Sequence, residues 1–138
     1  MTSVFADTFY WVALGDFADS SHGRALELAE ERVASHIIST DEVLVEYLTY
    51  FAKAPEQLRR KAVINVHGIL ADPHVRVIPQ SHESFLAGLE LYRARPDKGY
   101  SLVDCISMHT MRKEGLTEVL TNDRHFEQEG FRALFRDS

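Results

Sequence analysis

The sequence is poor in the residues that build covalent cross-links and soft-metal sites. Its 138 residues include one cysteine, Cys105, which excludes an intrachain disulfide and a cysteine-rich zinc site. No stretch approaches the roughly 18–20 apolar residues of a membrane span, and no basic segment precedes an apolar run near the N-terminus. We therefore expect a soluble, cytoplasmic protein with neither a membrane anchor nor a signal peptide.

Positive charge is also scarce. The chain has 15 basic and 21 acidic side chains, which gives a formal net charge of −6. Binding driven by phosphate neutralisation needs a basic surface, so this composition argues against a general nucleic-acid coat protein. It does not exclude an enzyme whose acids gather at a metal site. The length and the 45% apolar content predict one globular domain, residues 1–138.

Short apolar runs alternate with longer amphipathic stretches from end to end. The apolar runs predict strands at 4–6, 36–38, 75–78 and 118–121. The amphipathic stretches predict helices at 8–14, about 22–34, 41–51, 55–70, 81–95 and 101–115. This alternation is typical of an α/β domain with a mostly parallel central sheet flanked by helices.

The third of these helices carries its own signals. Ser39 with Glu42 three residues later fits a capping box, in which two side chains satisfy free backbone amides. The helix is expected to bury one arc of apolar side chains, Val43, Leu44, Tyr47, Leu48 and Phe51.

Four acids stand where such a fold would place a site. Asp7 directly follows the first predicted strand, and Asp123 lies two residues past the last one. Ligands of open parallel sheets bind outside the carboxyl ends of the strands. Asp104 is in the first turn of a helix that is apolar nearly all round, and Glu46 lies just outside the apolar arc of the capped helix.

Each acid alone also has an ordinary structural interpretation. Asp7 could cap the helix that follows it, and Asp104 could complete a capping box with Ser101. Asp123 lies in a turn, where aspartate is common, and Glu46 could be a solvated surface residue. No single acid supports a functional conclusion.

The set is more informative than its members. Carboxylates that converge from four segments would repel one another and raise one another's pKa. A hard divalent cation such as Mg²⁺ or Mn²⁺ relieves that repulsion and prefers oxygen ligands. Such a site suits phosphodiester hydrolysis, because the cation activates water and stabilises the leaving oxygen.

Four segments in this order resemble the PIN-domain ribonucleases, in particular the VapC-like toxins. These segments are Val4–Thr8, Thr40–Glu46, Tyr100–Cys105 and Leu120–Phe126. The resemblance implies a Rossmann-like three-layer fold. It also implies a Mg²⁺- or Mn²⁺-dependent endonuclease that cuts single-stranded or loop regions of RNA.

The resemblance also assigns residues and partners. It implies four catalytic metal ligands, Asp7, Glu46, Asp104 and Asp123, of which Asp123 matches the acid that varies more among members of the family. Hydroxyls that support these acids would come from Thr8, Ser101 and Thr121. The toxin members of the family pair as homodimers and are silenced by a small antitoxin, so both partners are expected here.

RNA must still approach an acidic protein. Phosphate contacts are expected from Arg59, Arg60, Arg124 and His125, and a base could stack on Tyr100 or Phe126. The run from Arg59 to Lys61 also fits an ordinary solvated helix face.

Three alternatives stay open. A housekeeping RNA-processing nuclease of the same fold would carry the same acids. A non-catalytic α/β binding module would use the groove to hold a partner. A phosphohydrolase with Asp7 as nucleophile is disfavoured, because such enzymes usually have a second acid two residues on and Phe9 stands there.

Overall fold

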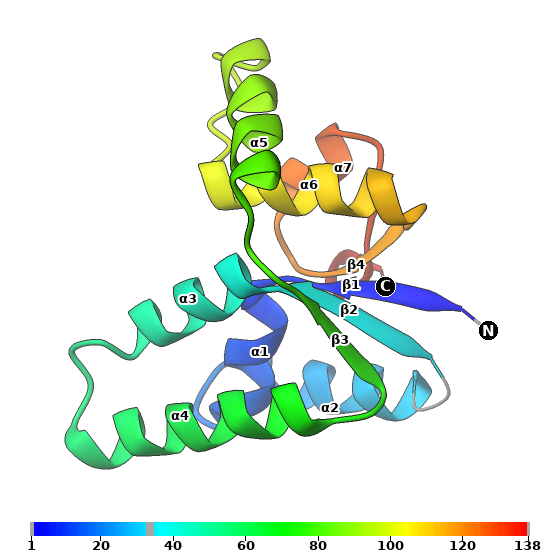
Figure 1. The fold of residues 1–138 in the computed structure, drawn as a ribbon. Coiled ribbons are helices and arrows are strands. Elements are labelled where there is room, and N and C mark those ends of the chain that lie inside the picture. The colour runs from blue at the N-terminus through cyan, green and yellow to red at the C-terminus, as the bar shows by residue number, and fades with distance from the viewer. Residues whose placement is uncertain (1, 33–34, 138) are drawn as a thin grey trace.

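A five-stranded parallel sheet runs through the computed structural model, which describes residues 2–32 and 35–137 (Figure 1). The strands are β1 (Ser3–Ala6), β2 (His36–Thr40), β3 (Val75–Ile78), β4 (Glu118–Leu120) and β5 (Arg132–Ala133). Their order in the sheet is β3-β2-β1-β4-β5, and every neighbouring pair is parallel. The predicted α/β fold with a parallel sheet is therefore confirmed.

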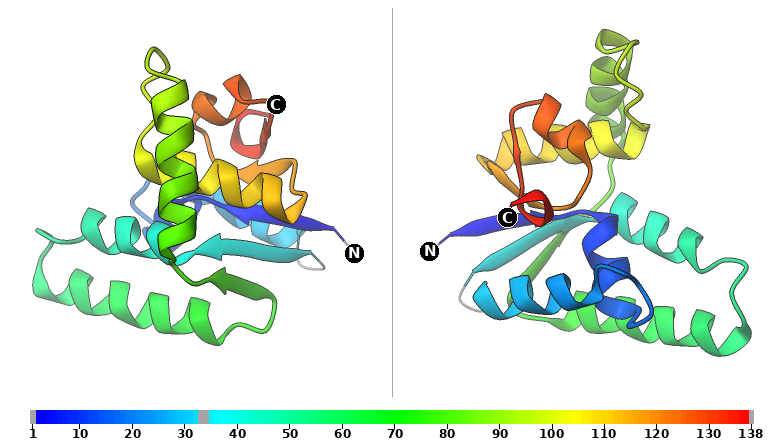
Figure 2. Two further views of the ribbon diagram at one scale, coloured as in Figure 1. Left: turned by 45° about the horizontal axis from the view of Figure 1, so that its top comes forward. Right: turned by 180° about the vertical axis from the view of Figure 1, so that it is seen from behind.

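Helices cover both faces of this sheet. On one face lie α1 (Thr8–Gly15), α2 (His22–Glu31) and α4 (Glu56–Ala71), and on the other lie α6 (Leu102–Glu114) and α7 (Arg124–Gln128) (Figure 1). The remaining helices are α3 (Asp41–Tyr50), α5 (His82–Ala94) and the short 3-10 helix η1 (Leu134–Arg136). Helix α5 stands away from the sheet and packs against α6 (Figure 2).

The predicted amphipathic stretches correspond closely to α1–α6, whereas α7 and η1 fall outside every predicted stretch. The helix expected over 22–34 is described as far as Glu31, and positions 33 and 34 lie outside the described residues. Gly115 ends α6 in the left-handed conformation, at φ 71°, which is the usual role of a glycine at the end of a helix. None of the helices in the described ranges combines the length and the apolar character that crossing a membrane requires.

Strand β1 is the centre of the core. Its residues Val4, Phe5 and Ala6 are fully buried, because β1 pairs with β2 on one side and with β4 on the other while helices cover both faces. The strand order changes direction at β1, which makes the carboxyl ends of β1 and β4 the switch point where such folds bind ligands.

The capping box predicted at Ser39 is wrong. Strand β2 continues to Thr40, which pairs with Ile78, so Ser39 lies inside the sheet. Its buried hydroxyl donates to the carbonyl of Ala6 at 2.8 Å and accepts from Nε1 of Trp11 at 3.2 Å. Thr40 caps α3 instead, with its Oγ1 accepting from the backbone N–H of Val43.

Two smaller expectations also need correction. Leu48 is exposed, since the buried face of α3 is narrower than the apolar arc in the sequence. Strand β4 ends at Leu120 and is followed by a fifth strand, β5, so Asp123 does not follow the last strand. β5 has only two residues, Arg132 and Ala133, which is too short for an apolar run to reveal it.

Gly88 permits the close approach of α5 to α6. A Cβ atom at this position would lie 2.4 Å from Cγ1 of Ile106 and 3.2 Å from its backbone nitrogen. Gly88 is also the buried residue of α5, so the helix docks through this point.

We therefore expect Gly88→Ala to lower the free energy of unfolding by about 1–3 kcal/mol, the usual cost of overpacking. The matched control is Gly68→Ala on α4, where an added Cβ meets nothing within 4 Å. It should stabilise the protein by roughly 0.5–1 kcal/mol, because alanine favours helix more than glycine does. Urea unfolding of both variants tests this, and equal stability of Gly88→Ala and the wild type would contradict it.

Candidate functional site

A cleft of about 580 Å³ opens at the carboxyl ends of β1 and β4. Its lining includes all four acids and all three hydroxyl residues singled out in the sequence, Asp7, Thr8, Glu46, Ser101, Asp104, Thr121 and Asp123. The tertiary structure thus brings together seven residues from four separate segments of the chain.

Asp7 is the most deeply buried of these acids. It occupies the N-cap position of α1, yet its side chain makes no capping hydrogen bond. It is 6% exposed, and its Oδ2 accepts a hydrogen bond from Oγ1 of Thr121 at 2.9 Å. Its Oδ1 is buried without a hydrogen-bond partner among the described residues. The ordinary capping interpretation of Asp7 therefore does not hold.

The surroundings of Asp7 disfavour its charge. Burial raises the pKa of Asp7 to about 7, and the nearby negative charges of Asp104 and Glu46 act in the same direction. The hydrogen bond from Thr121 opposes this rise but does not cancel it. The attraction of a bound cation would offset both the cost of desolvation and the repulsion.

Asp104 is held by the capping box that the sequence predicts. Its backbone N–H donates to Oγ of Ser101 at 3.0 Å, and the backbone N–H of Ser101 donates to Oδ2 of Asp104 at 3.1 Å. Burial raises the pKa of Asp104, and the charge of Asp123 raises it further. Capping and a place in the cleft are thus compatible, because the cap uses Oδ2 and fixes the orientation of the carboxylate.

Glu46 reaches the cleft from α3 with the help of α1. Thr8, in the first turn of α1, donates a hydrogen bond from Oγ1 to Oε1 of Glu46 at 2.5 Å. The half-buried glutamate is therefore fixed in place instead of extending freely into solvent.

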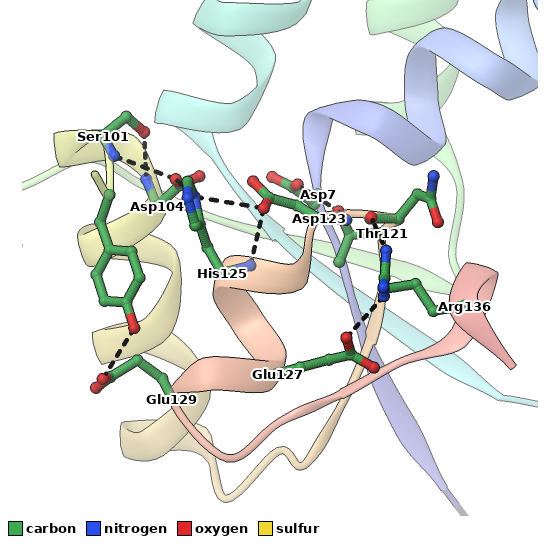
Figure 3. A network of polar contacts seen from close by, with 11 residues as sticks. Asp7, Ser101, Asp104, Thr121, Asp123, His125, Glu127, Glu129 and Arg136 are labelled. Atoms are coloured by element: carbon green, nitrogen blue, oxygen red, sulfur yellow. Dashed lines mark hydrogen bonds and ion pairs between the residues drawn. The ribbon is translucent and has the colours of Figure 1, made fainter. Parts of the chain in front are cut away.

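Thr121 connects two of the acids. Its hydroxyl donates to Asp7 and accepts from the backbone N–H of Asp123 at 3.2 Å (Figure 3). Asp123 in turn caps α7, with Oδ1 accepting from the backbone N–H of His125 at 2.9 Å. The turn that leads into α7 is thereby held against the end of β1.

His125 faces the acids, although sequence reasoning assigned it to RNA binding. Its Nδ1 lies 3.4 Å from Oδ2 of Asp104 and 3.3 Å from Oδ1 of Asp123 (Figure 3). One ligand atom from each of these three residues lies within 4.8 Å of the other two. The sequence signal for this placement was the spacing, since a residue two positions after Asp123 can lie close to its carboxylate.

A buried carboxylate holds the other side of this region. Glu129, whose side chain is 5% exposed, accepts from Arg95 and Arg112 and from the hydroxyl of Tyr100 at 3.1 Å. Burial alone would raise the pKa of Glu129, but these three donors outweigh it and lower the pKa. Tyr100 directly precedes Ser101, so this network positions the start of α6.

The predicted RNA contacts separate into two groups. Arg124 is exposed beside Asp123 and forms no ion pair within the described ranges. Arg59 and Arg60 do not line the cleft, because Arg59 bonds the carbonyl of Ala52 and Arg60 pairs with Glu56 on the exposed surface of α4. The structure therefore does not bring these two arginines to the acids.

The expected base stacking is also corrected. Phe126 is fully buried, with 0% exposure, and packs in the core beside Phe131. Tyr100 is buried as well, and its ring lies against His125 with 5.2 Å between the ring centroids. Neither aromatic face is free to receive a base.

Comparisons with known proteins agree with this geometry. The PIN domain family model matches residues 4–131. The 23S rRNA-specific endonuclease VapC20 of Mycobacterium tuberculosis is 28% identical over an alignment 136 positions long, which covers 93% of this chain and 95% of that protein. Its crystal structure, described as that of a Sarcin-Ricin loop cleaving toxin, superimposes with a TM-score of 0.81 over the same shares of both chains.

A more distant structure shows the fold alone. A crystal structure of VapBC2 from Rickettsia felis, bound to a DNA fragment from its promoter, matches with a TM-score of 0.67 at 17% identity. The match covers 96% of this chain and 97% of that one.

The buried Asp7 carboxylate leads to a test of stability. Without metal, the folded protein binds a proton at Asp7 more tightly than the unfolded chain does, since its folded pKa of about 7 exceeds the ordinary value of 3.8. The contribution of Asp7 to stability is therefore full below about pH 4 and falls as the pH rises towards 7. In EDTA at pH 8, we expect Asp7→Asn to stabilise the protein by roughly 1–3 kcal/mol.

Thermal unfolding in EDTA, and then in Mg²⁺ or Mn²⁺, measures this effect. Added metal should raise the Tm of the wild type more than that of Asp7→Asn. The exposed Asp97, outside the cleft, supplies the control Asp97→Asn, which should behave as the wild type does. A lower Tm for Asp7→Asn than for the wild type in EDTA at pH 8 would contradict the claim that the buried, charged Asp7 destabilises the folded protein.

Proposed function

The chain belongs to the PIN-domain family, and we propose that it is a metal-dependent endoribonuclease acting as the toxin of a toxin–antitoxin pair. One observation above all supports this proposal. The cleft at the switch point contains the four predicted acids together with Asp19, and the most buried of them, Asp7, has a carboxylate oxygen without a hydrogen-bond partner in the described part of the chain.

The donor set of the cleft fits a hard divalent cation. Four carboxylates offer oxygen ligands, which Mg²⁺ and Mn²⁺ prefer. Burial makes the negative charge of Asp7 unfavourable unless a positive charge lies beside it. We assign the metal-holding role to Asp7, Glu46, Asp104 and Asp123. When bound, the cation supplies an activated water for attack on phosphorus and stabilises charge on the leaving oxygen.

The chain's own residues orient these acids. Thr121 holds Asp7 and Thr8 holds Glu46, each through a hydroxyl that donates to the carboxylate. Ser101 holds Asp104 through its backbone N–H. Fixed carboxylates need no rearrangement when the substrate arrives, which is the main source of rate enhancement at electrostatic sites.

Arg124 is the basic residue best placed to meet RNA. It is exposed next to Asp123, so it can contact a phosphate at the mouth of the cleft. We propose RNA loops as the substrate class. VapC20 is named for 23S rRNA and its structure for the Sarcin-Ricin loop, so an RNA of that loop is the first substrate to test.

The toxin role also requires protein partners. Apolar side chains are exposed on α5, namely Phe85, Leu86, Leu89 and Tyr92, and others on α3 and α4, namely Val45, Leu48, Leu58, Val63 and Ile64. Helices that expose several large apolar side chains are typical of interaction sites. We propose an antitoxin and a second copy of the chain as occupants of these surfaces, and the cytoplasm as the place where they meet.

Cleavage assays test the enzymatic proposal. Incubation of purified protein with a Sarcin-Ricin loop RNA and Mg²⁺ or Mn²⁺ should produce defined fragments. EDTA should stop the reaction, and added metal should restore it. Loss of a residue that merely supports a metal ligand costs about 10–100-fold, so Asp104→Asn, which alters a ligand, should lower the rate by at least about 100-fold. Asp97→Asn should retain the wild-type rate. Cleavage that continues in EDTA and also in the Asp104→Asn variant would contradict the proposal.

Growth assays test the toxin role separately. Induced expression of the wild type or Asp97→Asn should arrest bacterial growth, whereas Asp104→Asn should not. Coexpression of a small protein from the neighbouring reading frame should restore growth. An active nuclease whose expression leaves growth unchanged would instead indicate a housekeeping enzyme.

A further inference from the structure

His125 presents a ring nitrogen to the two acids at the mouth of the cleft. Its Nδ1 is buried and lies 3.3 Å from Oδ1 of Asp123 and 3.4 Å from Oδ2 of Asp104. At these positions Nδ1 makes no hydrogen bond with the described residues. Two ligands that bind one octahedral ion at about 2.1 Å lie roughly 3 Å apart. The two distances from Nδ1 to the carboxylate oxygens are therefore close to those between atoms that share a cation.

The orientation of the imidazole is fixed from two directions. The ring of Tyr100 packs against it, and Tyr100 is itself held by the buried Glu129. The backbone N–H of His125 also donates to Asp123, which ties the start of α7 to the acid (Figure 3). Because both neighbours are fixed, Nδ1 is directed towards Asp104 and Asp123 even without a ligand.

A second observation indicates that this cleft accepts a positive charge. Asp7 lines the same cleft as Asp104 and Asp123, is more than nine-tenths buried, and leaves Oδ1 without a partner in the ranges described. This carboxylate belongs to a different element from the His125 cluster, so it is independent evidence for a cation site.

We propose that His125 binds the catalytic cation through Nδ1, as a nitrogen ligand beside Asp104 and Asp123, and that this ligand biases the site towards Mn²⁺ over Mg²⁺. The inference rests on the metal dependence proposed above. Mg²⁺ prefers oxygen ligands and retains its waters, whereas imidazole is a good ligand for transition metals. A nitrogen in the ligand set would thus contribute more to the binding of Mn²⁺ than to that of Mg²⁺.

Pulsed EPR of the Mn²⁺-loaded protein detects the bond directly. The spin of Mn²⁺ couples to a coordinated ¹⁴N, so the wild type should show a nitrogen modulation that changes when the protein is labelled with ¹⁵N-histidine. Because the chain has seven histidines, variants are needed to assign the signal. His125→Gln should abolish it, and His67→Gln, at an exposed position on α4, should preserve it.

Calorimetric titration gives a second readout that does not depend on RNA cleavage. We expect His125→Gln to weaken Mn²⁺ binding about tenfold and Mg²⁺ binding about twofold or less, since the nitrogen contributes more to the binding of Mn²⁺. His67→Gln should bind both ions as the wild type does.

The possible outcomes separate this inference from the proposed function. Mn²⁺ binding without nitrogen coupling in the wild type would overturn the role of His125 while leaving a metal-dependent nuclease intact. Equal losses of Mn²⁺ and Mg²⁺ affinity in His125→Gln would overturn the proposed bias. A wild type that binds neither ion would overturn the metal site itself.

Discussion

The burial of the Asp7 carboxylate is the constraint around which the rest of the structure is arranged. Strand β1 is covered on both faces and paired on both edges. Asp7, which directly follows this strand, is therefore buried as well. There the carboxylate has one hydrogen bond, from Thr121, and one oxygen without a partner among the described residues. A charge in this position destabilises the folded chain unless a cation accompanies it.

The other acids are fixed in ways that increase this effect. Asp104 and Glu46 raise the pKa of Asp7 through their charge, and both are held in place by hydrogen bonds to Ser101 and Thr8. A protein selected for stability alone would separate or neutralise such groups. Their retention in one cleft is the usual exchange of stability for function at a preorganised site.

This arrangement accounts for part of the acidic composition, since five of the 21 acidic side chains line the cleft. A net charge of −6 describes the average surface, whereas the RNA substrate proposed above would meet a particular cleft. Cations bound among the four acids would reverse the local sign there, and Arg124 adds a positive charge beside it. Net charge is therefore a poor guide to the substrate of a protein that gathers several of its acids in one cleft.

Much of this protein was determined by sequence alone, because the signals are local. Residues a few places apart determine the alternation of strands and helices and the Ser101–Asp104 capping box. They also determine the place of each acid within its own strand end or helix. Other features depend on which segments meet in space. The bonds from Thr8 to Glu46 and from Thr121 to Asp7 join residues 38 and 114 positions apart. Only the tertiary structure decided that Arg59 and Arg60 lie away from the cleft and that His125 faces it, because side-chain direction follows from how α4 and α7 pack on the sheet.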